Sequence, residues 1–338
     1  MKKLKHLSRS AKNAILFAVL GVLLCVAFLL ALHAWEKRQY NLQIAEESRY
    51  ADVGQSVIYL DGKEYRERKH LETVLLIGLD KFGSASQGSS EAYSNDQQSD
   101  FLMLVIIDRK NNTYTPLHIN RDSMAPVQIL GVGGRIVDTV TEQLALAHTY
   151  GSGKEDSCRN TVKAVSDFLY GIEVDHYISF RMDAVGVMND LVGGVTLEIR
   201  DDFSAEDASL IQGQTVRLNG EQALHYVRAR QSMEDSTNVA RMERQRQYLR
   251  ELQVQTLDCL REDENFAARA LANLSEYITS DCTVDELSEL LSDTMEYGMA
   301  EFETIPGEAV KGETYMEFYP DEQKMRDLML GLFFEEKK

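Results

Sequence analysis

The chain has few cysteines, and this shortage excludes a fold built on disulfides. Its 338 residues include four cysteines, and Cys25 lies inside a long apolar segment. The other three, Cys158, Cys259 and Cys282, allow at most one bridge, so a Cys259–Cys282 disulfide and three free thiols both remain open. There is no CxxC pair and no Cys/His spacing typical of a metal site.

An excess of positive over negative charge is also lacking, except at the N-terminus. The net charge is -18, although the first 35 residues hold five Lys or Arg and no acid. The rest of the chain is therefore more acidic than the whole, and its field repels nucleic-acid phosphate. We expect no nucleic-acid partner, and any anion that binds must be held by a local basic site.

Common catalytic motifs are missing as well. The sequence contains no GxSxG elbow, no HExxH helix and no EF-hand loop. The segment Gly151–Lys154 is not a nucleotide P-loop, because His148 stands where the first glycine is needed. His118 falls in a predicted strand and is expected to be structural.

One long apolar run is present, from Ala14 to Ala34. About 20 apolar residues span a bilayer as a helix, whereas the core of a cleaved signal peptide is shorter, about 7–15 residues. No small-x-small cleavage pattern ends the run. The basic flank places the N-terminus in the cytoplasm. We therefore expect a single-pass protein of the cell membrane, with everything after residue 35 outside the cell.

Alternating strand and helix patterns predict an α/β fold after this anchor. Asp61-Gly62 indicates a hairpin near residues 56–65, and the apolar strands that follow are typical of a sheet covered on both faces. The expected fold is an α-β-α sandwich with a central mixed sheet. Further strands are predicted over 174–180, 195–199 and 302–305, and helices over 140–150, 160–170, 183–192, 220–227 and 239–260. The expected segments are a basic tail (1–13), an anchor (14–34), a stalk with hairpin (35–70), a main domain (71–260) and an acidic helical extension packed on it (261–338).

Several arginines stand out in this acidic chain. Arg228 and Arg230 are two residues apart, Arg241 and Gln245 share a helix face, and Arg121 follows a predicted strand. The forked guanidinium suits phosphate oxygens, so together these residues favour a cradle for phosphate or pyrophosphate. Taken singly, each arginine fits a surface ion pair better than a binding site, and it is their number within the 18 residues from Arg228 to Gln245 that favours a site.

Two carboxylates occupy comparable positions. Asp80 ends the first apolar strand, and Asp100 precedes the second. Ligands gather at strand ends of open α/β sheets, and Mg²⁺ prefers oxygen ligands together with substrate phosphates. The alternative is that both aspartates are ordinary turn or cap residues.

An ordered set of motifs carries a family resemblance over about residues 71–258. The motifs are 73–80 (TVLLIGLD), 99–105 (SDFLMLV), 120–123 (NRDS), 191–195 (LVGGV), 218–224 (LNGEQAL), 226–230 (YVRAR) and 241–245 (RMERQ). Together they resemble the LytR-CpsA-Psr family of bacterial cell-envelope proteins. The family often has proline at the position of Asn120, threonine at Ser123 and histidine at Gln231.

The resemblance implies a magnesium-dependent phosphotransferase that faces outward from the membrane. It would move a glycopolymer, such as wall teichoic acid or a capsular or secondary wall polysaccharide, from a polyprenyl pyrophosphate carrier to peptidoglycan. The resemblance also implies an apolar tunnel for the lipid between sheet and helices. Matched by motif, Asp80, Asp100 and Arg121 are the catalytic residues, with Mg²⁺ on Asp80 and Asp100. The pyrophosphate set is Arg121, Arg228, Arg230, Arg241 and Gln245.

A different class of function uses the same arginines. A non-catalytic protein that binds polyprenyl phosphate or another polyanion, as an envelope scaffold or regulator, also needs a basic cradle. It gains nothing from two carboxylates at the site unless a metal is present. The aspartates therefore discriminate between the two hypotheses.

Overall fold

The computed structural model describes residues 57–60, 63–81, 97–131, 133–203, 207–229, 238–263 and 265–337. The predicted anchor over residues 14–34 lies outside these ranges. Within them, no helix combines the length and the apolar character needed to cross a bilayer.

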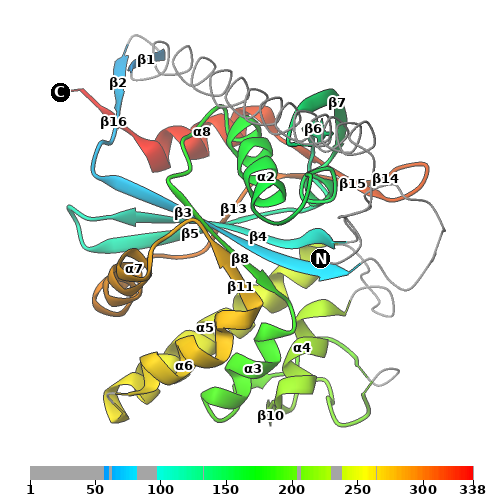
Figure 1. Cartoon of the computed structure of the whole chain (residues 1–338), viewed down its shortest axis with the longest axis vertical. Helices are drawn as coiled ribbons and strands as arrows, with labels where there is room; N and C mark the ends of the chain where they lie inside the picture. Colours follow the sequence, from blue (N-terminus) through cyan, green and yellow to red (C-terminus); the bar gives the residue numbers. More distant parts are fainter. Residues whose placement is uncertain are drawn as a thin grey trace, which may run out of the picture.

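A mixed sheet of seven strands forms the centre of the fold (Figure 1). The strand order is β11-β8-β3-β4-β5-β12, and β13 also pairs with β5. β8 runs parallel to β3, and β12 and β13 run parallel to β5, while the other neighbours are antiparallel. The bounds are β3 (Leu71–Lys81), β4 (Gln97–Asp108), β5 (Thr113–Ile119), β8 (His176–Arg181), β11 (Ile278–Ser280), β12 (Gly298–Met299) and β13 (Glu303–Thr304).

Helices cover both faces of this sheet (Figure 1). Because side chains alternate along a strand, Leu75 and Ile77 pack with one layer and Leu76 with the other. The first layer contains α2 (Lys154–Phe168), α8 (Glu322–Phe333) and the hairpin of β6 (Met124–Leu130) and β7 (Ile136–Gln143). The second contains α3 (Ala184–Leu191), α4 (Gly220–Arg228), α5 (Asn238–Glu262), α6 (Phe266–Leu274) and α7 (Val284–Glu296). The expected α/β fold with a central mixed sheet is confirmed.

The start of α4 follows the sequence signal closely. The Asn219 side chain accepts a hydrogen bond from the Gln222 backbone N–H at 2.9 Å, and the Gln222 side chain accepts from the Asn219 N–H at 3.1 Å. This capping box satisfies two backbone donors that the helix itself leaves open. It fixes where the helix begins, and hence where it presents Arg228 nine residues on.

The prediction of a helix over residues 140–150 is wrong. Residues up to Gln143 belong to strand β7, and only Leu144–Leu146 form a short 3₁₀ helix, η2. β7 pairs along its length with β6, and Gly133 and Gly134 near the turn have positive φ. The β-branched residues Thr139, Val140 and Thr141 suit a strand, and the neighbouring strand β6 supplies its partner in a hairpin that the sequence analysis did not predict.

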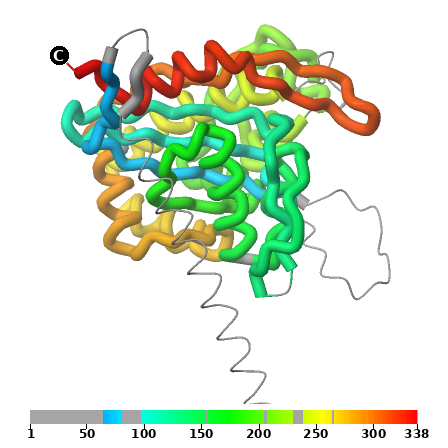
Figure 2. Tube along the Cα trace, turned by 90° about the horizontal axis from the view of Figure 1, so that it is seen from above, coloured from blue at the N-terminus to red at the C-terminus, as the bar shows by residue number. Residues whose placement is uncertain are grey.

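The C-terminal part of the chain returns to both the sheet and the N-terminal hairpin. β16 (Phe334–Glu336) pairs with β2 (Lys63–Glu67), which pairs with β1 (Val57–Leu60), so the expected hairpin is confirmed (Figure 2). Strands β11, β12 and β13 enter the central sheet from beyond residue 260. The smaller elements are β9 (Thr196–Glu198), β10 (Thr215–Arg217), η3 (Ser275–Tyr277), β14 (Gly307–Lys311) and β15 (Met316–Pro320).

The cysteine alternatives resolve in favour of free thiols. Cys158, Cys259 and Cys282 are all unbridged, and Cys158 is buried. Cys158 packs as an apolar side chain in the same hydrophobic cluster as Leu75 and Ile77, on the first face of the sheet.

Candidate functional site

A β-bulge at the end of β3 and β4 places two carboxylates together with several arginines. Gly78 pairs with Phe101 and Leu79 pairs with Ser99, so Asp100 has no opposite residue on β3. A bulge bends its strand and re-aims the extra side chain. Asp100 thereby reaches Arg121 from the turn after β5 and Arg241 from α5, and Asp80 at the end of β3 reaches Arg228 from α4.

Asp100 binds two guanidinium groups that are distant in sequence. Arg121 Nη1 bonds to Asp100 Oδ1, and Arg241 Nη1 lies 3.4 Å from Oδ2. Arg241 Nη2 also donates to the Asp100 backbone oxygen at 3.1 Å. The side chains of Asp100, Arg121 and Arg241 are 13%, 11% and 3% exposed. A charged side chain that is this poorly hydrated is costly unless an opposite charge lies beside it.

Arg228 is the last residue of α4 and pairs with Asp80 through Nη2. The next residue, Ala229, has extended ψ, so the helix ends at the motif, as a clamp built from Arg228 and Arg230 would require. Arg230 lies outside the described residues. The Arg228 side chain is 37% exposed, more than Arg121 or Arg241, and so remains open to a ligand.

Gln245 is buried one helical turn from Arg241, and both residues face the site from α5. Its Nε2 donates to the Val227 backbone oxygen at 3.1 Å. This contact ties α5 to the end of α4 immediately before Arg228.

Two asparagines hold Arg241 in place, and sequence reasoning missed their connection. Asn238 Oδ1 accepts from Arg241 Nη2, while Asn238 Nδ2 donates to Asn120 Oδ1 at 2.7 Å. Asn120 Oδ1 also accepts from the Asp122 N–H at 3.0 Å. The family often has proline at the position of Asn120. In this chain the Asn120 side chain instead connects the loop after β5 to α5 through its hydrogen bond with Asn238. The two asparagines lie 118 positions apart, and no local pattern links them.

Arg244 is a second positioning residue that the sequence did not single out. Its buried guanidinium pairs with Asp201 and donates to the backbone oxygens of Tyr226 (3.2 Å) and Ala229. Arg244 therefore holds the C-terminal end of α4 on either side of Arg228. It does not face the proposed anion-binding position. Only its partners distinguish it from Arg241 on the same helix.

His118 lies beneath the arginines with 1% exposure, its ring 5.0 Å from that of Phe101. Burial lowers the pKa of His118 well below its ordinary value, and the positive charges of Arg246 and Arg241 lower it further. The imidazole is therefore neutral. Arg246 is a half-buried guanidinium that sequence analysis overlooked, and it adds positive charge to this end of the sheet.

An apolar cavity of about 260 Å³ begins next to this cluster. Phe101 follows Asp100, Val227 precedes Arg228, and both line the cavity together with Gln245. A second cavity, of about 230 Å³, shares Leu249 and Leu252 with the first. The rest of the first cavity is lined by Leu76, Ile178, Phe180, Met182, Ala184, Val185, Met188, Tyr248, Leu274 and Ile278.

Comparison with known proteins gives consistent matches. The model of the LytR_cpsA_psr family matches residues 36–330. Biofilm regulatory protein A of Streptococcus mutans is 27% identical over 240 residues, which is 68% of this chain and 54% of that protein. The polyisoprenyl-teichoic acid–peptidoglycan teichoic acid transferase TagV of Bacillus subtilis is 28% identical over 187 residues, 53% of this chain and 42% of TagV. The matched region thus spans about half of each relative.

Solved structures share the fold. The structure of TagT bound to LIIa-WTA has a TM-score of 0.57 and 23% identity, and the match covers 82% of this chain and 95% of that one. At this identity the likeness concerns the arrangement of the chain alone.

Proposed function

The chain belongs to the LytR_cpsA_psr family, and we propose that it is a phosphotransferase that moves a glycopolymer from a polyprenyl pyrophosphate carrier to peptidoglycan. The observation that carries the proposal is that an apolar cavity begins at Phe101 and Val227, the residues next to Asp100 and Arg228 of the guanidinium cluster. A lipid pyrophosphate has these two halves: a doubly charged head and a long hydrocarbon tail. The name of TagV, a polyisoprenyl-teichoic acid–peptidoglycan transferase, supports the choice of donor and acceptor.

The arginines would hold the pyrophosphate. Arg121, Arg228 and Arg241 now pair with Asp80 and Asp100, and phosphate oxygens would take over part of this pairing. Charge-assisted bonds from planar guanidinium forks are the strongest class of hydrogen bond to phosphate. Arg230 and Gln245 belong to the same proposed set.

A magnesium ion held by Asp80 and Asp100 is part of the proposal. Mg²⁺ is usually held by one or two carboxylates plus substrate phosphates, and Asp80 and Asp100 supply oxygen donors of this kind beside the proposed phosphate position. When bound there, Mg²⁺ would neutralise charge on the phosphate oxygens. Arginines that lose a carboxylate partner to the ion would be free to face the phosphate.

The proposed reaction is a direct displacement at phosphorus. A hydroxyl of the acceptor glycan attacks the phosphorus that carries the glycopolymer, and the bridging P–O bond breaks. Polyprenyl phosphate leaves, and the glycopolymer stays joined to the acceptor through a phosphodiester. The hydroxyl proton passes to Asp80 or Asp100. Arg121 and Arg241 stabilise the charge that develops on the equatorial oxygens.

We further propose that the protein acts outside the cell, anchored by residues 14–34. Protease added to wall-less cells should then digest the chain beyond residue 35. A mature protein that starts near residue 35 and leaves the membrane fraction would contradict the anchor.

A blocked cavity tests the proposed lipid site. Leu252 lines both cavities, so Leu252→Trp should prevent binding of long-chain polyprenyl pyrophosphate while leaving inorganic pyrophosphate binding unchanged. Val254 is on the same helix but 55% exposed, so Val254→Trp is the matched control and should bind both ligands normally. Equal lipid binding by the two variants would place the tail elsewhere.

Catalysis is tested separately from binding. The full chain is incubated with polyprenyl-linked glycan, an acceptor glycan and Mg²⁺, and phosphodiester-linked product is measured. Transfer supports the enzyme. The non-catalytic binder would be supported instead if the protein bound the lipid tightly without transfer and its Arg228→Lys variant bound the lipid more weakly.

A further inference from the structure

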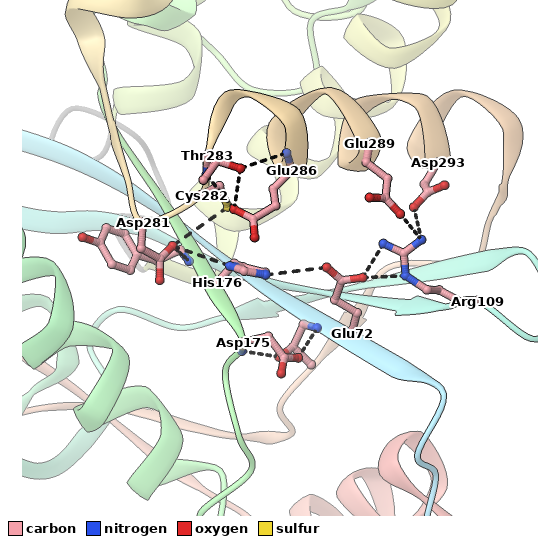
Figure 3. Close-up of polar contacts among 12 residues, drawn as sticks. Glu72, Arg109, Asp175, His176, Asp281, Cys282, Thr283, Glu286, Glu289 and Asp293 are labelled. Carbon is pink, nitrogen blue, oxygen red and sulfur yellow. Dashed lines mark hydrogen bonds and ion pairs between the residues drawn. The ribbon is translucent and has the colours of Figure 1, made fainter. Parts of the chain in front are cut away.

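A second polar cluster lies at the opposite end of the central sheet from the arginines. It contains His176, the first residue of β8, with Asp281 and Cys282 from the turn between β11 and α7 (Figure 3). One ligand atom from each of the three lies within 4.8 Å of the others. His176 pairs with Val74, six positions before Asp80 on β3. At about 3.3 Å per residue, the cluster is about 20 Å from the arginine site.

The three donors converge with no hydrogen bond between His176 and Asp281 and only a long S–H···O contact from Cys282 to Asp281. His176 Nδ1 lies 3.9 Å from Asp281 Oδ1, and Cys282 Sγ lies 4.0 Å from the same oxygen. Ordinary N–H···O bonds span about 2.7–3.2 Å. Zinc bonds of about 2.0–2.3 Å in a tetrahedral arrangement put neighbouring donor atoms about 3.3–3.7 Å apart. The observed distances of 3.9 and 4.0 Å are slightly longer than these, so the donors would move a few tenths of an ångström inward around an ion.

The turn that carries two of the donors is fixed to β8. Asp281 Oδ1 accepts from the Tyr177 N–H at 2.8 Å. Ser280 Oγ donates to the Tyr177 backbone oxygen at 2.7 Å and accepts from the Cys282 N–H at 3.1 Å. Because the turn is already held in place, binding of an ion would cost little conformational entropy, and this favours a high affinity for the ion.

A carboxylate stands on the other side of the imidazole ring. His176 Nε2 lies 3.8 Å from Glu72 Oε1, while Glu72 Oε2 accepts from Arg109 Nε at 2.6 Å (Figure 3). Histidines that bind a metal through one nitrogen usually direct the other N–H to a carboxylate, which orients the ring and raises its basicity. At 3.8 Å Glu72 is outside hydrogen-bond distance of Nε2, and it would move closer to take this role when Nδ1, on the side of Asp281, binds the ion.

The surroundings favour a cation. The carboxylates of Asp281, Glu286 and Glu72 lie near the Cys282 thiol and give this place negative charge. His176 and Asp281 are 24% and 38% exposed, so an ion can enter from solution.

We propose that His176, Asp281 and Cys282 form a binding site for a divalent cation of the zinc class. The combination of imidazole nitrogen, thiolate sulfur and carboxylate oxygen suits zinc, whereas magnesium and calcium prefer oxygen alone. Water or Glu286 would take the fourth position. The ion would join the turn before α7 to β8, and so hold the later part of the chain on the sheet far from the phosphate site.

Cobalt is a direct probe, because a thiolate bound to Co²⁺ gives a charge-transfer absorption that carboxylates do not give. The full chain, stripped with chelator, is titrated with Co²⁺, and Zn²⁺ is then added as competitor. We expect the thiolate band to appear and Zn²⁺ to abolish it. Loss of partners outside the ligand set costs about 10- to 100-fold in metal affinity, so His176→Gln should weaken Co²⁺ binding by at least about 100-fold.

Cysteine variants decide which thiol is involved. Cys282→Ser should lose the band, while Cys259→Ser, which changes another partly exposed thiol, should keep it. Circular dichroism verifies that each variant is folded, and the conservative Asp281→Asn gives a second measure of the site. The proposal is overturned if the wild-type protein gives no band, or if the band survives in Cys282→Ser.

Discussion

Removing the charge of Asp100 should destabilise the protein without ligand and yet make it respond more strongly to pyrophosphate. The Asp100 carboxylate neutralises Arg121 and Arg241, which are 11% and 3% exposed. Asparagine keeps the shape and one acceptor oxygen but removes the charge that Asp100 sets against two poorly hydrated guanidinium groups, while Arg121 keeps Asp122 at 3.4 Å. Breaking a buried pair in this way costs about 3–5 kcal/mol, and we expect the lower end because some hydrogen bonding remains.

A loss of about 3 kcal/mol should lower the melting temperature by roughly 6–12 °C for a domain of this size. Pyrophosphate supplies the missing negative charge, so it should restore most of that loss in Asp100→Asn and stabilise the wild-type protein less. The measurement is thermal and chemical denaturation of the full chain, with and without inorganic pyrophosphate and in the absence of Mg²⁺. Transfer with Mg²⁺ present should be abolished in the same sample.

Asp201→Asn is the matched control. Asp201 also pairs with a buried arginine, Arg244, but that arginine holds backbone oxygens at the end of α4. This variant should also lose stability, and pyrophosphate should not restore it. If Asp100→Asn melts like the wild-type protein, or if pyrophosphate rescues both variants equally, the proposed anion position at Asp100 is refuted.

Three further predictions concern single positions. Arg228→Lys keeps the charge but not the fork, so calorimetry should show pyrophosphate affinity reduced about 10- to 150-fold; unchanged affinity would remove Arg228 from the site. Gly78→Ala puts a methyl group 2.8 Å from Phe101 Cβ at the bulge, so denaturant unfolding should reveal a loss of roughly 1–3 kcal/mol, and a neutral result would mean the bulge gives way. Burial lowers the pKa of His148 from 6.5 to about 4, so the folded protein keeps it neutral while the unfolded chain protonates below pH 6.5. Stability should therefore fall as the pH drops from 6.5 towards 4, and His148→Gln should flatten that slope by about 1.4 kcal/mol per pH unit; an unchanged slope would contradict this account.

Local chemistry determined much of the fold. The capping box of Asn219 and Gln222 set the start of α4, because both partners lie within one helical turn. The apolar runs in β3 and β4 predicted a sheet covered on both faces, since neither strand has a polar side to offer to water. Residues 140–143 were misassigned because their strand partner lies on β6, and a short apolar pattern does not distinguish helix from strand without it.

The candidate site divides in the same way. Sequence alone supplied the types of residue, since forked arginines in an acidic chain point to a bound anion wherever they lie. Only the tertiary structure brought Arg121, Arg228 and Arg241 onto two aspartates, through a bulge that turns Asp100 towards α5. The roles of Asn238 and Arg244 could not be predicted from the sequence either, because their partners lie far away along the chain.

The cluster of His176, Asp281 and Cys282 shows the physical reason most clearly. No spacing predicted it, because His176 is separated from the other two by more than a hundred residues. Residue type and local spacing are written in the sequence, and they determine helix ends, strand faces and the kind of ligand. Which distant side chains meet is decided by strand pairing and by the packing of helices on the sheet, where the free energy depends on many partners at once.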